Sequence, residues 1–322
     1  MMKNFINISD VPKSELRLII DNAMVRKGER AELNKNTVDI DAPLDEKILI
    51  MLFEKPSTRT RISFDLAVKQ LGGKSLILNP DEIHYGSGDE SLYDTAKVLS
   101  QYADIVMLRT HAHKNVEEFS KHLSIPVING LTCLSHPCQI MSDIMTFEEL
   151  KGPIKNKKIA WLGDGNNIVH SLIEASVQFE FQLNIASPKG YEPNKKIIQW
   201  AKKNKGNVLV TRNPLKAVKS ADCVMTDKWI SMGDKIKKNK KKKALKPYQV
   251  NKKIMNAADK NAIFMHCLPA NRGEEVTNEV IDGKQSEVWL EALNRIHAQK
   301  SIIEWCLDIL NKEKIDNLKT NF

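Results

Sequence analysis

Hydroxyl and guanidinium side chains are grouped between Ser57 and Arg61, in the order Ser-Thr-Arg-Thr-Arg. The group follows the apolar run 47–53 and opens a helical pattern. Hydroxyls and backbone N–H groups at a helix N-terminus bind anions. Cations in a first turn oppose the helix dipole by a few tenths to ~1 kcal/mol each, and a bound anion reverses that effect. The segment therefore predicts a phosphate site, made by Ser57, Thr58, Arg59 and Thr60.

A purely structural alternative stays open for the arginines of this segment. They could pair with the neighbouring acids Glu54 and Asp65, and Arg61 stands four residues before Asp65 on the same predicted helix. Arg61 is therefore as well explained by the scaffold as by a ligand. The Gly-x-x-x-x-Gly-Lys pattern of a nucleotide loop is not present.

Six further polar clusters follow predicted strands or lie on predicted helices, and ligands bind at the carboxyl ends of strands in open α/β sheets. They are Arg109-Thr110, 136–139 (His-Pro-Cys-Gln), 163–167 (Gly-Asp-Gly-Asn-Asn), 227–233, 264–270 and 294–297. His136 and Gln139 could both donate hydrogen bonds to a substrate carbonyl from a helix start. Asp227 suits an ammonium group. Taken singly, Arg109 and Arg295 are typical of surface arginines, and Cys267 is typical of a small buried apolar residue.

Metal and nicotinamide sites are disfavoured by the spacing of the residues. Cys133, His136 and Cys138 have no second ligand pair at zinc-site spacing. In the Gly-x-Gly turn that begins at Gly163, Ile168 takes the place of the third glycine. No acid closes the next predicted strand, which ends at Ser187. We therefore expect neither a metal nor a nicotinamide cofactor.

Fully apolar segments alternate with helical patterns along most of the chain, which is typical of parallel sheets covered on both faces. Expected strands are 47–53, 75–78, 104–108, 126–129, 158–162, 183–186, 207–210, 223–226 and 262–266. Expected helices are a first one capped by Ser9 or Asp10, then 58–71, 91–102, 115–123, 137–150, 168–179, 193–202, 214–220 and 287–310.

The turn Lys151-Gly152-Pro153 predicts a domain junction. The 322 residues suffice for about two domains of ~150 residues each. We therefore predict two doubly wound α/β domains, residues 1–150 and 151–289.

The net charge of +9 raises the possibility of a nucleic-acid partner. However, eight lysines between Lys235 and Lys246 account for eight of those nine charges. No aromatic residue is interleaved with them for base stacking. A solvated loop or helix end is the expected role of this run, and no nucleic-acid partner is predicted.

The five cysteines form no Cys-x-x-Cys pair, which favours a reducing compartment. The start lacks the apolar stretch of a secretory signal, and the longest apolar run, 48–53, is too short to span a bilayer. The expectation is a cytoplasmic protein without a membrane partner.

Taken together, the clusters resemble the ornithine carbamoyltransferase family over nearly the whole chain and in the family's order. The most specific motifs are 53–61 (Phe-Glu-Lys-Pro-Ser-Thr-Arg-Thr-Arg), 136–139, 163–167, 231–233 (Ser-Met-Gly) and 266–270 (His-Cys-Leu-Pro-Ala). The first two resemble carbamoyltransferases in general. Ser-Met-Gly and His-Cys-Leu-Pro resemble the ornithine branch.

The resemblance implies that the carbamoyl group of carbamoyl phosphate passes to the δ-amine of L-ornithine, giving citrulline and phosphate without a cofactor. It also implies a C-terminal helix, about 290–322, that packs back on the first domain, and a homotrimer with shared active sites. The implied carbamoyl phosphate ligands are Ser57, Thr58, Arg59, Thr60, His84, Arg109, His136, Gln139, Cys267, Leu268 and Arg295. The implied ornithine ligands are Asn167, Asp227, Ser231 and Met232. The implied catalytic residues are Arg59, Arg109, His136, Asp227 and Cys267.

One departure from the family concerns His84, which stands where family members often carry glutamine. Two other functions remain open from the sequence. A carbamoyltransferase could use another amine, such as putrescine or aspartate, although Asp227 disfavours aspartate. A lysine-rich RNA-binding protein with an inactive site would show salt-dependent RNA binding and no carbamoyl transfer.

Overall fold

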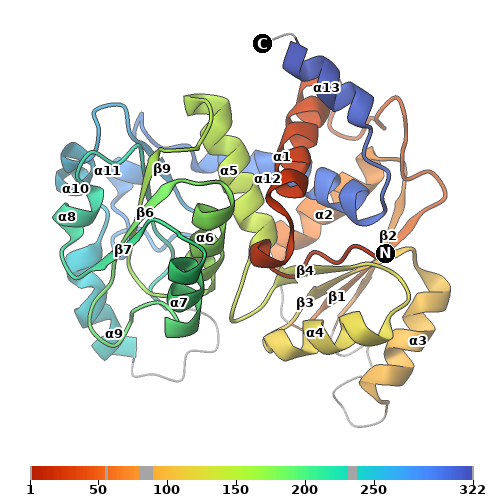
Figure 1. Ribbon diagram of the computed structural model, residues 1–322, viewed down its shortest axis with the longest axis horizontal. Helices are drawn as coiled ribbons and strands as arrows, with labels where there is room; N and C mark the ends of the chain where they lie inside the picture. Colours follow the sequence, from red (N-terminus) through yellow and green to blue (C-terminus); the bar gives the residue numbers. More distant parts are fainter. Residues whose placement is uncertain (1, 55–56, 80–89, 231–237, 321–322) are drawn as a thin grey trace. The chain divides into compact units, whose positions relative to one another are not determined.

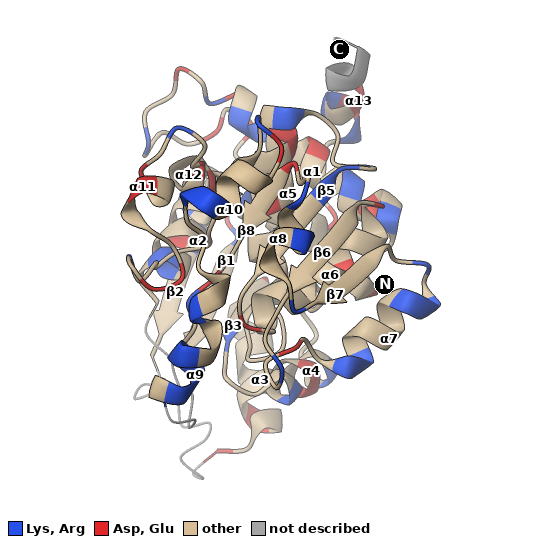
Figure 2. Ribbon diagram, turned by 90° about the vertical axis from the view of Figure 1, so that its left-hand side faces the viewer, with Lys and Arg blue, Asp and Glu red and all other residues tan. Residues whose placement is uncertain are grey.

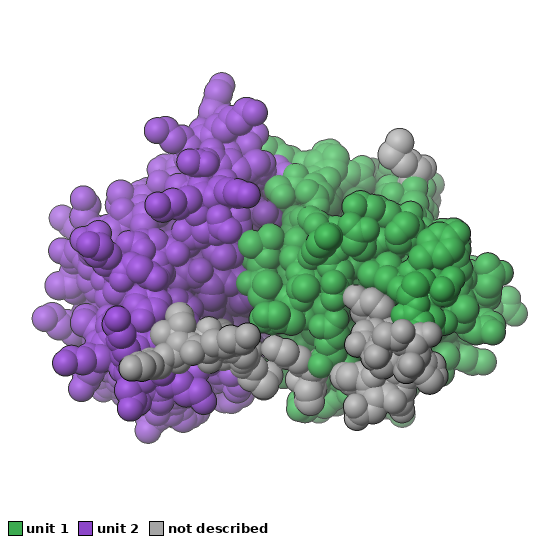
Figure 3. Space-filling model, turned by 90° about the horizontal axis from the view of Figure 1, so that it is seen from below, with its two compact units in different colours: residues 1–145, 294–322 green, residues 146–293 purple. Residues whose placement is uncertain are grey.

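The computed structural model describes residues 2–54, 57–79, 90–230 and 238–320. The predictions for His84, Ser231 and Met232 lie outside these residues, as do those for Lys235 and Lys237. The chain divides into two compact units, coloured separately in Figure 3. Unit 1 comprises Met1–Met145 and Asn294–Phe322, and unit 2 comprises Thr146–Leu293. Within the described ranges, no helix is both long enough and apolar enough to cross a membrane.

Unit 1 contains a parallel sheet of four strands in the order β2-β1-β3-β4 (Figure 1). The strands are β1 (Ile48–Phe53), β2 (Lys74–Leu78), β3 (Ile105–Arg109) and β4 (Val127–Leu131). The sequence of β1, Ile-Leu-Ile-Met-Leu-Phe, is apolar at every position because this strand is central and is buried over nearly its whole length. The edge strand β2 is half exposed.

The α-helices with described residues in unit 1 are α1 (Lys13–Gly28), α2 (Thr58–Gln70), α3 (Leu92–Tyr102), α4 (His113–His122), α5 (Pro137–Lys151), α12 (Val288–Cys306) and α13 (Lys312–Thr320). α3 and α4 cover one sheet face, where Leu99 and Phe119 join Ile50 and Val106 in a buried cluster. The predicted helix 287–310 ends at Cys306 instead, and a separate helix, α13, packs against α1 (Figure 1). The predicted return of the C-terminal helical segment to the first domain is thus confirmed.

The predicted cap of the first helix was wrong. Residues Ile8–Asp10 form a separate 3-10 turn, η1, and α1 starts after Pro12. The carbonyl oxygen of Pro12 accepts from the N–H groups of Glu15 and Leu16. Proline is compatible with this position because its missing N–H has no intrahelical partner at a helix start.

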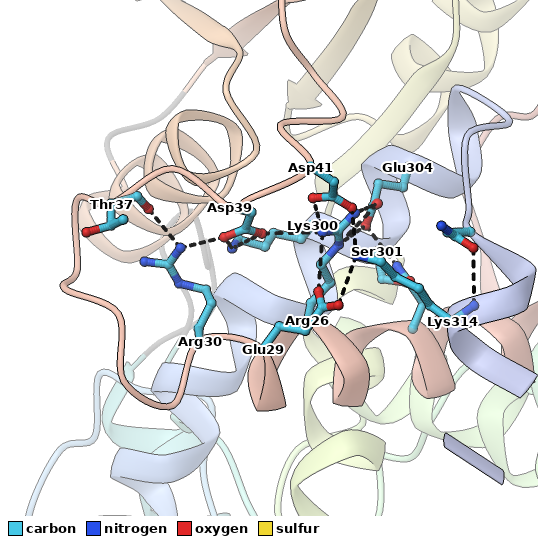
Figure 4. Close-up of polar contacts among 12 residues, drawn as sticks. Arg26, Glu29, Arg30, Thr37, Asp39, Asp41, Lys300, Ser301, Glu304 and Lys314 are labelled. Carbon is cyan, nitrogen blue, oxygen red and sulfur yellow. Dashed lines mark hydrogen bonds and ion pairs between the residues drawn. The ribbon is translucent and has the colours of Figure 1, made fainter. Parts of the chain in front are cut away.

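Charged side chains from distant parts of the chain meet inside unit 1 (Figure 4). This buried ion cluster is made by Arg26 of α1, Arg30 and Asp39, which follow α1, and Lys300 and Glu304 of α12. Lys300 Nζ lies 2.9 Å from Asp39 Oδ2, and Arg26 Nε lies 3.1 Å from Glu304 Oε2. Arg30 also pairs with Asp39. At the rim of the cluster, Asp41 binds Arg26 at 2.7 Å and Lys314 of α13 at 2.9 Å.

Unit 2 contains a parallel sheet of five strands in the order β7-β6-β5-β8-β9. The strands are β5 (Lys158–Leu162), β6 (Gln182–Ala186), β7 (Val208–Thr211), β8 (Cys223–Met225) and β9 (Ile263–Met265). The helices wholly within it are α6 (Asn167–Gln178), α7 (Lys195–Lys203), α8 (Pro214–Val218), α9 (Lys238–Leu245), α10 (Lys252–Ala257) and α11 (Asn278–Ile281). A short 3-10 turn, η3 (Lys246–Tyr248), follows α9.

The predicted fold class, two α/β domains with parallel sheets, is confirmed, and each predicted strand is present within one or two residues. In each sheet, successive strands are first added on one side of the starting strand and then on the other. The switch lies between β1 and β3 in unit 1 and between β5 and β8 in unit 2. Ligands of such sheets bind at the carboxyl ends of the strands beside that switch.

Candidate active site

In unit 1, the segment that follows β1 forms the start of α2. Ser57 is the N-cap residue in extended conformation, and its side chain makes no capping hydrogen bond. Thr58 is exposed, whereas Ser57 and Arg59 are half-buried. These three side chains therefore lie at a helix start where backbone N–H groups point outward, as an anion site requires.

The hydroxyl of Thr60 joins residues from three parts of unit 1. Thr60 is buried, and its Oγ1 accepts from Arg109 Nη1 at 2.9 Å and from Arg295 Nη2 at 3.0 Å. Arg295 Nη1 also donates to Gln139 Oε1. Four of the predicted phosphate and carbamoyl ligands, spread over more than 230 residues of sequence, thus form one hydrogen-bonded group. Arg295, which in isolation was expected to be exposed, is only 4% exposed.

Asp143 is a further member of this group that the sequence did not indicate. Gln139 Nε2 donates to Asp143 Oδ1 at 2.7 Å, and Asp143 is 2% exposed. The two residues stand four apart on α5, so their pairing follows from helical geometry. This bond fixes the orientation of the Gln139 amide, with its oxygen toward Arg295.

An irregularity in the sheet lies beside Arg109. Leu108 pairs with Asn129 but Arg109 pairs with Leu131, so β4 carries one extra residue, Gly130. A Cβ atom on Gly130 would lie 2.2 Å from Met107 Sδ and 3.2 Å from Leu108 O, so a side chain at this position would require the Met107 side chain to move. Such bulges often redirect a neighbouring side chain at functional sites.

His136 precedes α5 and is buried. Burial lowers the pKa of its imidazole well below the ordinary value of 6.5, and the positive charges of Arg295 and Arg109 lower it further. The ring is therefore neutral at pH 7. A neutral imidazole can donate one hydrogen bond to a substrate carbonyl without adding a third charge beside the two guanidinium groups.

In unit 2, the polar residues after β5, β8 and β9 converge on Asp227. Asn166 Nδ2 donates to Asp227 Oδ2 at 2.6 Å, and the half-buried thiol of Cys267 donates to Asp227 Oδ1 at 3.3 Å. The expectation that Cys267 is merely a buried apolar residue was therefore wrong. The residue bonded to Asp227 is Asn166, which belongs to the predicted polar cluster 163–167 but was not among the implied ornithine ligands. Asn167, which it did, is the first residue of α6.

His266 orients the chain beside Cys267 rather than facing a ligand. Its Nδ1 accepts from Leu268 N–H at 2.9 Å, so its proton is on Nε2, which lies 3.3 Å from the buried Glu275 carboxylate. Ligand atoms of Asp227, His266 and Cys267 lie within 4.8 Å of one another, a spacing that could hold a cation. The bonds described above already engage both nitrogens of His266 and both oxygens of Asp227.

The sequence left open that Glu54 and Asp65 pair with the arginines of 57–61, and it predicted a solvated lysine run; the contacts bear on both. Asp65 pairs with Lys69 at 2.9 Å, and Glu54 accepts from the His111 N–H at 2.8 Å, so both acids have partners other than the arginines of 57–61.

The lysine run, part of which forms α9, was expected to be a solvated loop or helix end. Lys240 and Lys243 are exposed as expected, but Lys241 is buried.

Two family models match the chain. The one described as "Aspartate/ornithine carbamoyltransferase, carbamoyl-P binding domain" matches residues 3–149. The one described as "Aspartate/ornithine carbamoyltransferase, Asp/Orn binding domain" matches residues 155–306. Together they cover most of both units.

Curated and solved relatives agree with this match. The chain is 51% identical over 306 residues to an ornithine carbamoyltransferase of Brucella suis, covering 95% of this chain and 96% of that protein. A solved ornithine carbamoyltransferase from Pyrococcus furiosus is 42% identical with a TM-score of 0.89, covering 96% of this chain and 98% of the other. An anabolic ornithine carbamoyltransferase from Campylobacter jejuni is 35% identical with a TM-score of 0.86, covering 95% and 99%.

Proposed function

The chain belongs to the aspartate/ornithine carbamoyltransferase family, and from that premise we propose how its residues perform the transfer. The reaction moves the carbamoyl group of carbamoyl phosphate to the δ-amine of L-ornithine and yields L-citrulline and phosphate. Unit 1 binds carbamoyl phosphate and unit 2 binds ornithine, which agrees with the descriptions of the two family domains.

The phosphate of the substrate is held at the start of α2 by Ser57, Thr58, Arg59 and Thr60. One observation carries this proposal: the buried hydroxyl of Thr60 accepts hydrogen bonds from the guanidinium groups of Arg109 and Arg295. Two guanidinium groups held at such a helix start supply the charge and planar hydrogen bonding that phosphate oxygens require. When the bond between the phosphate and the carbamoyl carbon breaks, the same groups at the start of α2 stabilise the phosphate as the leaving group.

The carbamoyl oxygen is polarised by Arg109 and by the neutral imidazole of His136. When the amine attacks the carbonyl carbon, a tetrahedral intermediate forms and this oxygen gains negative charge. Donors already fixed in place stabilise such an oxyanion without reorganisation. Gln139 acts chiefly through Arg295, since its amide is bonded to both Arg295 and Asp143.

Ornithine is bound in unit 2 by Asp227 and by Asn167, the first residue of α6. The roles of Ser231 and Met232 stay as the family resemblance implies. An alkyl amine with a pKa near ~10.4 is mostly protonated at pH 7, and only the neutral amine is a nucleophile. The Asp227 carboxylate pairs with the α-ammonium, and Cys267 and Leu268 follow β9 beside it. The Cys267 thiol donates a hydrogen bond to the Asp227 carboxylate and so helps to orient it toward the α-ammonium.

The test of this function is citrulline formation from carbamoyl phosphate and ornithine, with Arg59→Ala and Arg61→Ala compared. We expect Arg59→Ala to lower kcat/KM by about 100-fold or more, the usual effect of losing a charged transition-state contact. Arg61→Ala, the matched control in the same helical turn, should remain near wild type. Near-normal turnover by Arg59→Ala would contradict the phosphate assignment. A panel of amines, including putrescine and aspartate, tests the choice of ornithine.

We also propose a physiological direction, a location and an oligomeric state for this enzyme. Synthesis of citrulline for arginine is the proposed direction, as the Campylobacter jejuni relative is described as anabolic. A cytoplasmic location is supported by five free cysteines. A homotrimer is supported by the family and by apolar side chains exposed on unit 1, such as Tyr93 and Tyr102 of α3 and Leu76 of β2.

A further inference from the structure

The lysine run contains one residue that differs from its neighbours in burial. Lys241 is 3% exposed, whereas Lys238, Lys240 and Lys243 on the same helix are exposed; in Figure 2, blue basic residues cover much of α9. Lys241 and Leu245 are four residues apart and are both buried, so they define the inward face of α9. A buried lysine needs a partner because an unpaired buried charge strongly destabilises a fold.

The partner of Lys241 is an acid in the substrate turn. Lys241 Nζ lies 2.7 Å from Asp164 Oδ2, with side-chain exposures of 4% and 13%. The ammonium also lies 5.8 Å from the centre of the Tyr191 ring, a favourable position over an aromatic face. Lys241 is therefore held in one place from two directions.

The turn that carries Asp164 is fixed by its own backbone. The indole N–H of Trp161 donates to Asp164 O at 3.0 Å, and Gly165 N donates to Tyr191 O at 2.8 Å. A Cβ on Gly165 would lie 2.3 Å from the backbone of Glu192, so the turn is packed tightly against residues 191–193. The next residue, Asn166, caps α6 and donates to Asp227. A displacement of Asp164 would thus move the amide that orients Asp227.

We propose that Lys241 is a positioning residue for the ornithine site. It acts through Asp164 and Asn166 on Asp227. Its ammonium also neutralises Asp164, which leaves the Asp227 carboxylate to receive the ammonium of the amino acid. This inference rests on the proposed function, because it assigns Lys241 to the ornithine half of the same reaction.

The experiment compares steady-state kinetics for Lys241→Met with those for Lys240→Met and Lys243→Met, exposed lysines on the same helix. In Lys241→Met, the KM for ornithine should rise by about tenfold, which corresponds to ~1.4 kcal/mol of lost binding. The KM for carbamoyl phosphate should stay within about twofold, since that ligand belongs to unit 1. Lys241→Arg should restore most of the ornithine affinity. Both control variants should match wild type.

A second comparison separates positioning from mere stability. Asp164→Asn and Lys241→Met should raise the KM for ornithine to similar extents, and the double variant should be no worse than either, since the two side chains act as one unit. If Lys241→Met yields no folded protein, the KM for ornithine of the double variant is compared with that of Lys241→Arg. Neither of these proteins leaves a buried charge unpaired, and only Lys241→Arg keeps the ion pair with Asp164.

An ornithine KM near wild type in folded Lys241→Met, or in the double variant, would overturn the inference. Equal rises in both KM values would also overturn it. Absence of citrulline formation by the wild-type protein would instead overturn the proposed function, so the two failures are distinguishable.

Discussion

A thiol that donates to a carboxylate is the main local feature of the proposed ornithine half-site. Cys267 Sγ lies 3.3 Å from Asp227 Oδ1, and the Asn166 amide donates a hydrogen bond to the other oxygen, Oδ2. In this arrangement the carboxylate has two donors before any substrate binds. An incoming ammonium therefore meets a carboxylate whose direction is already fixed, which lowers the ordering that binding requires.

Replacement of Cys267 by alanine removes one of those donors. We expect the KM for ornithine to rise by about fivefold, as for the loss of a hydrogen bond of ~1 kcal/mol, with a smaller change for carbamoyl phosphate. Initial-rate kinetics with each substrate varied in turn measure the difference. Cys133→Ala, which alters an exposed cysteine, is the control. Equal loss for both substrates would count against the placement of Cys267 on ornithine.

His297 on α12 is a second residue whose protonation is set by the fold. Burial lowers its pKa from 6.5 to about 3, and the nearby positive charges of Lys300, Lys27 and Arg30 act in the same direction. Between pH 6.5 and about 3, the unfolded chain binds a proton at this residue that the folded chain does not. The stability that the neutral ring contributes is therefore complete above pH 6.5 and is lost progressively as the pH falls toward 3.

Substitution of His297 by glutamine should weaken this acid sensitivity. The free energy of unfolding should fall less steeply below pH 6 in the variant, by up to ~1.4 kcal/mol per pH unit, the contribution of one proton. Urea denaturation between pH 4.5 and 8 provides the measurement. Above pH 7 the difference between the two proteins should be constant, which serves as the internal control. Parallel curves down to pH 4.5 would show that His297 is not the source.

At the scale of elements, the buried ion cluster connects α1 with α12 (Figure 4). Asp39 receives Lys300 and Arg30, and Glu304 receives Arg26 and Asn22. Because α12 also carries Arg295, the same contacts that hold this helix on α1 determine where Arg295 meets Thr60. The cluster therefore supports the proposed phosphate site although none of its own residues is a proposed ligand.

Asp39→Asn should destabilise the protein by about 3–5 kcal/mol, because it leaves buried cations without their carboxylate. Chemical denaturation at pH 7 measures this, and Glu118→Gln is the control, since its pair with Lys121 is exposed. At a temperature where the variant is folded, its kcat should also fall if α12 shifts. A change in stability no larger than that of Glu118→Gln would show that the cluster is dispensable.

The elements differ in how far their sequences predict them. Strands such as β1 and β5 were predicted because a buried parallel strand needs an uninterrupted apolar run. Helix α9 was not predicted because Lys-Asn-Lys-Lys-Lys-Lys-Ala-Leu shows little apolar periodicity, and the spacing of Lys241 and Leu245 was its only signal. The pairing of Arg26 with Glu304, 278 residues apart, leaves no local pattern at all.

The candidate site likewise contains residues that a local sequence pattern indicates and residues that only the tertiary structure reveals. Most of the proposed ligand motifs stand out in the sequence because they follow a strand with an unusual combination of side chains. Arg295 lies on α12 instead and was indicated only by the family resemblance. Asp143 was missed, and Asn166 was named only as a member of the cluster 163–167. Both act by holding another residue, Gln139 or Asp227, and such support depends on tertiary geometry. Lys241 was hidden among similar residues, since burial is not visible in composition.

At the scale of the whole molecule, unit 1 exposes apolar side chains that a further subunit could cover. Tyr93, Val98 and Tyr102 of α3 are each about half exposed or more, and Leu76 lies on the edge strand β2. Large exposed apolar side chains, aromatic ones especially, are enriched at protein–protein contacts. We assign these residues to the interface of the proposed trimer.

Light scattering at micromolar concentration should give about three times the mass of the 36.5 kDa chain. The double variant Tyr93→Glu and Tyr102→Glu should reduce that mass, because charges placed in an apolar contact lose their hydration without a partner. Leu215→Glu, at an exposed apolar position in unit 2, is the matched control and should leave the mass unchanged. A wild-type protein of single-chain mass at all concentrations would contradict the trimer.

The division of unit 1 into two sequence segments has a consequence for synthesis. All of unit 2, residues 146–293, is made before the last segment of unit 1 leaves the ribosome. At typical translation rates of ~5–20 residues per second, this interval lasts roughly 10–30 s. During that time Arg26 and Asp39 exist without Glu304 and Lys300, and Thr60 without Arg295. The nascent chain can therefore complete the ornithine half first, and the carbamoyl phosphate half becomes competent only near the end of translation.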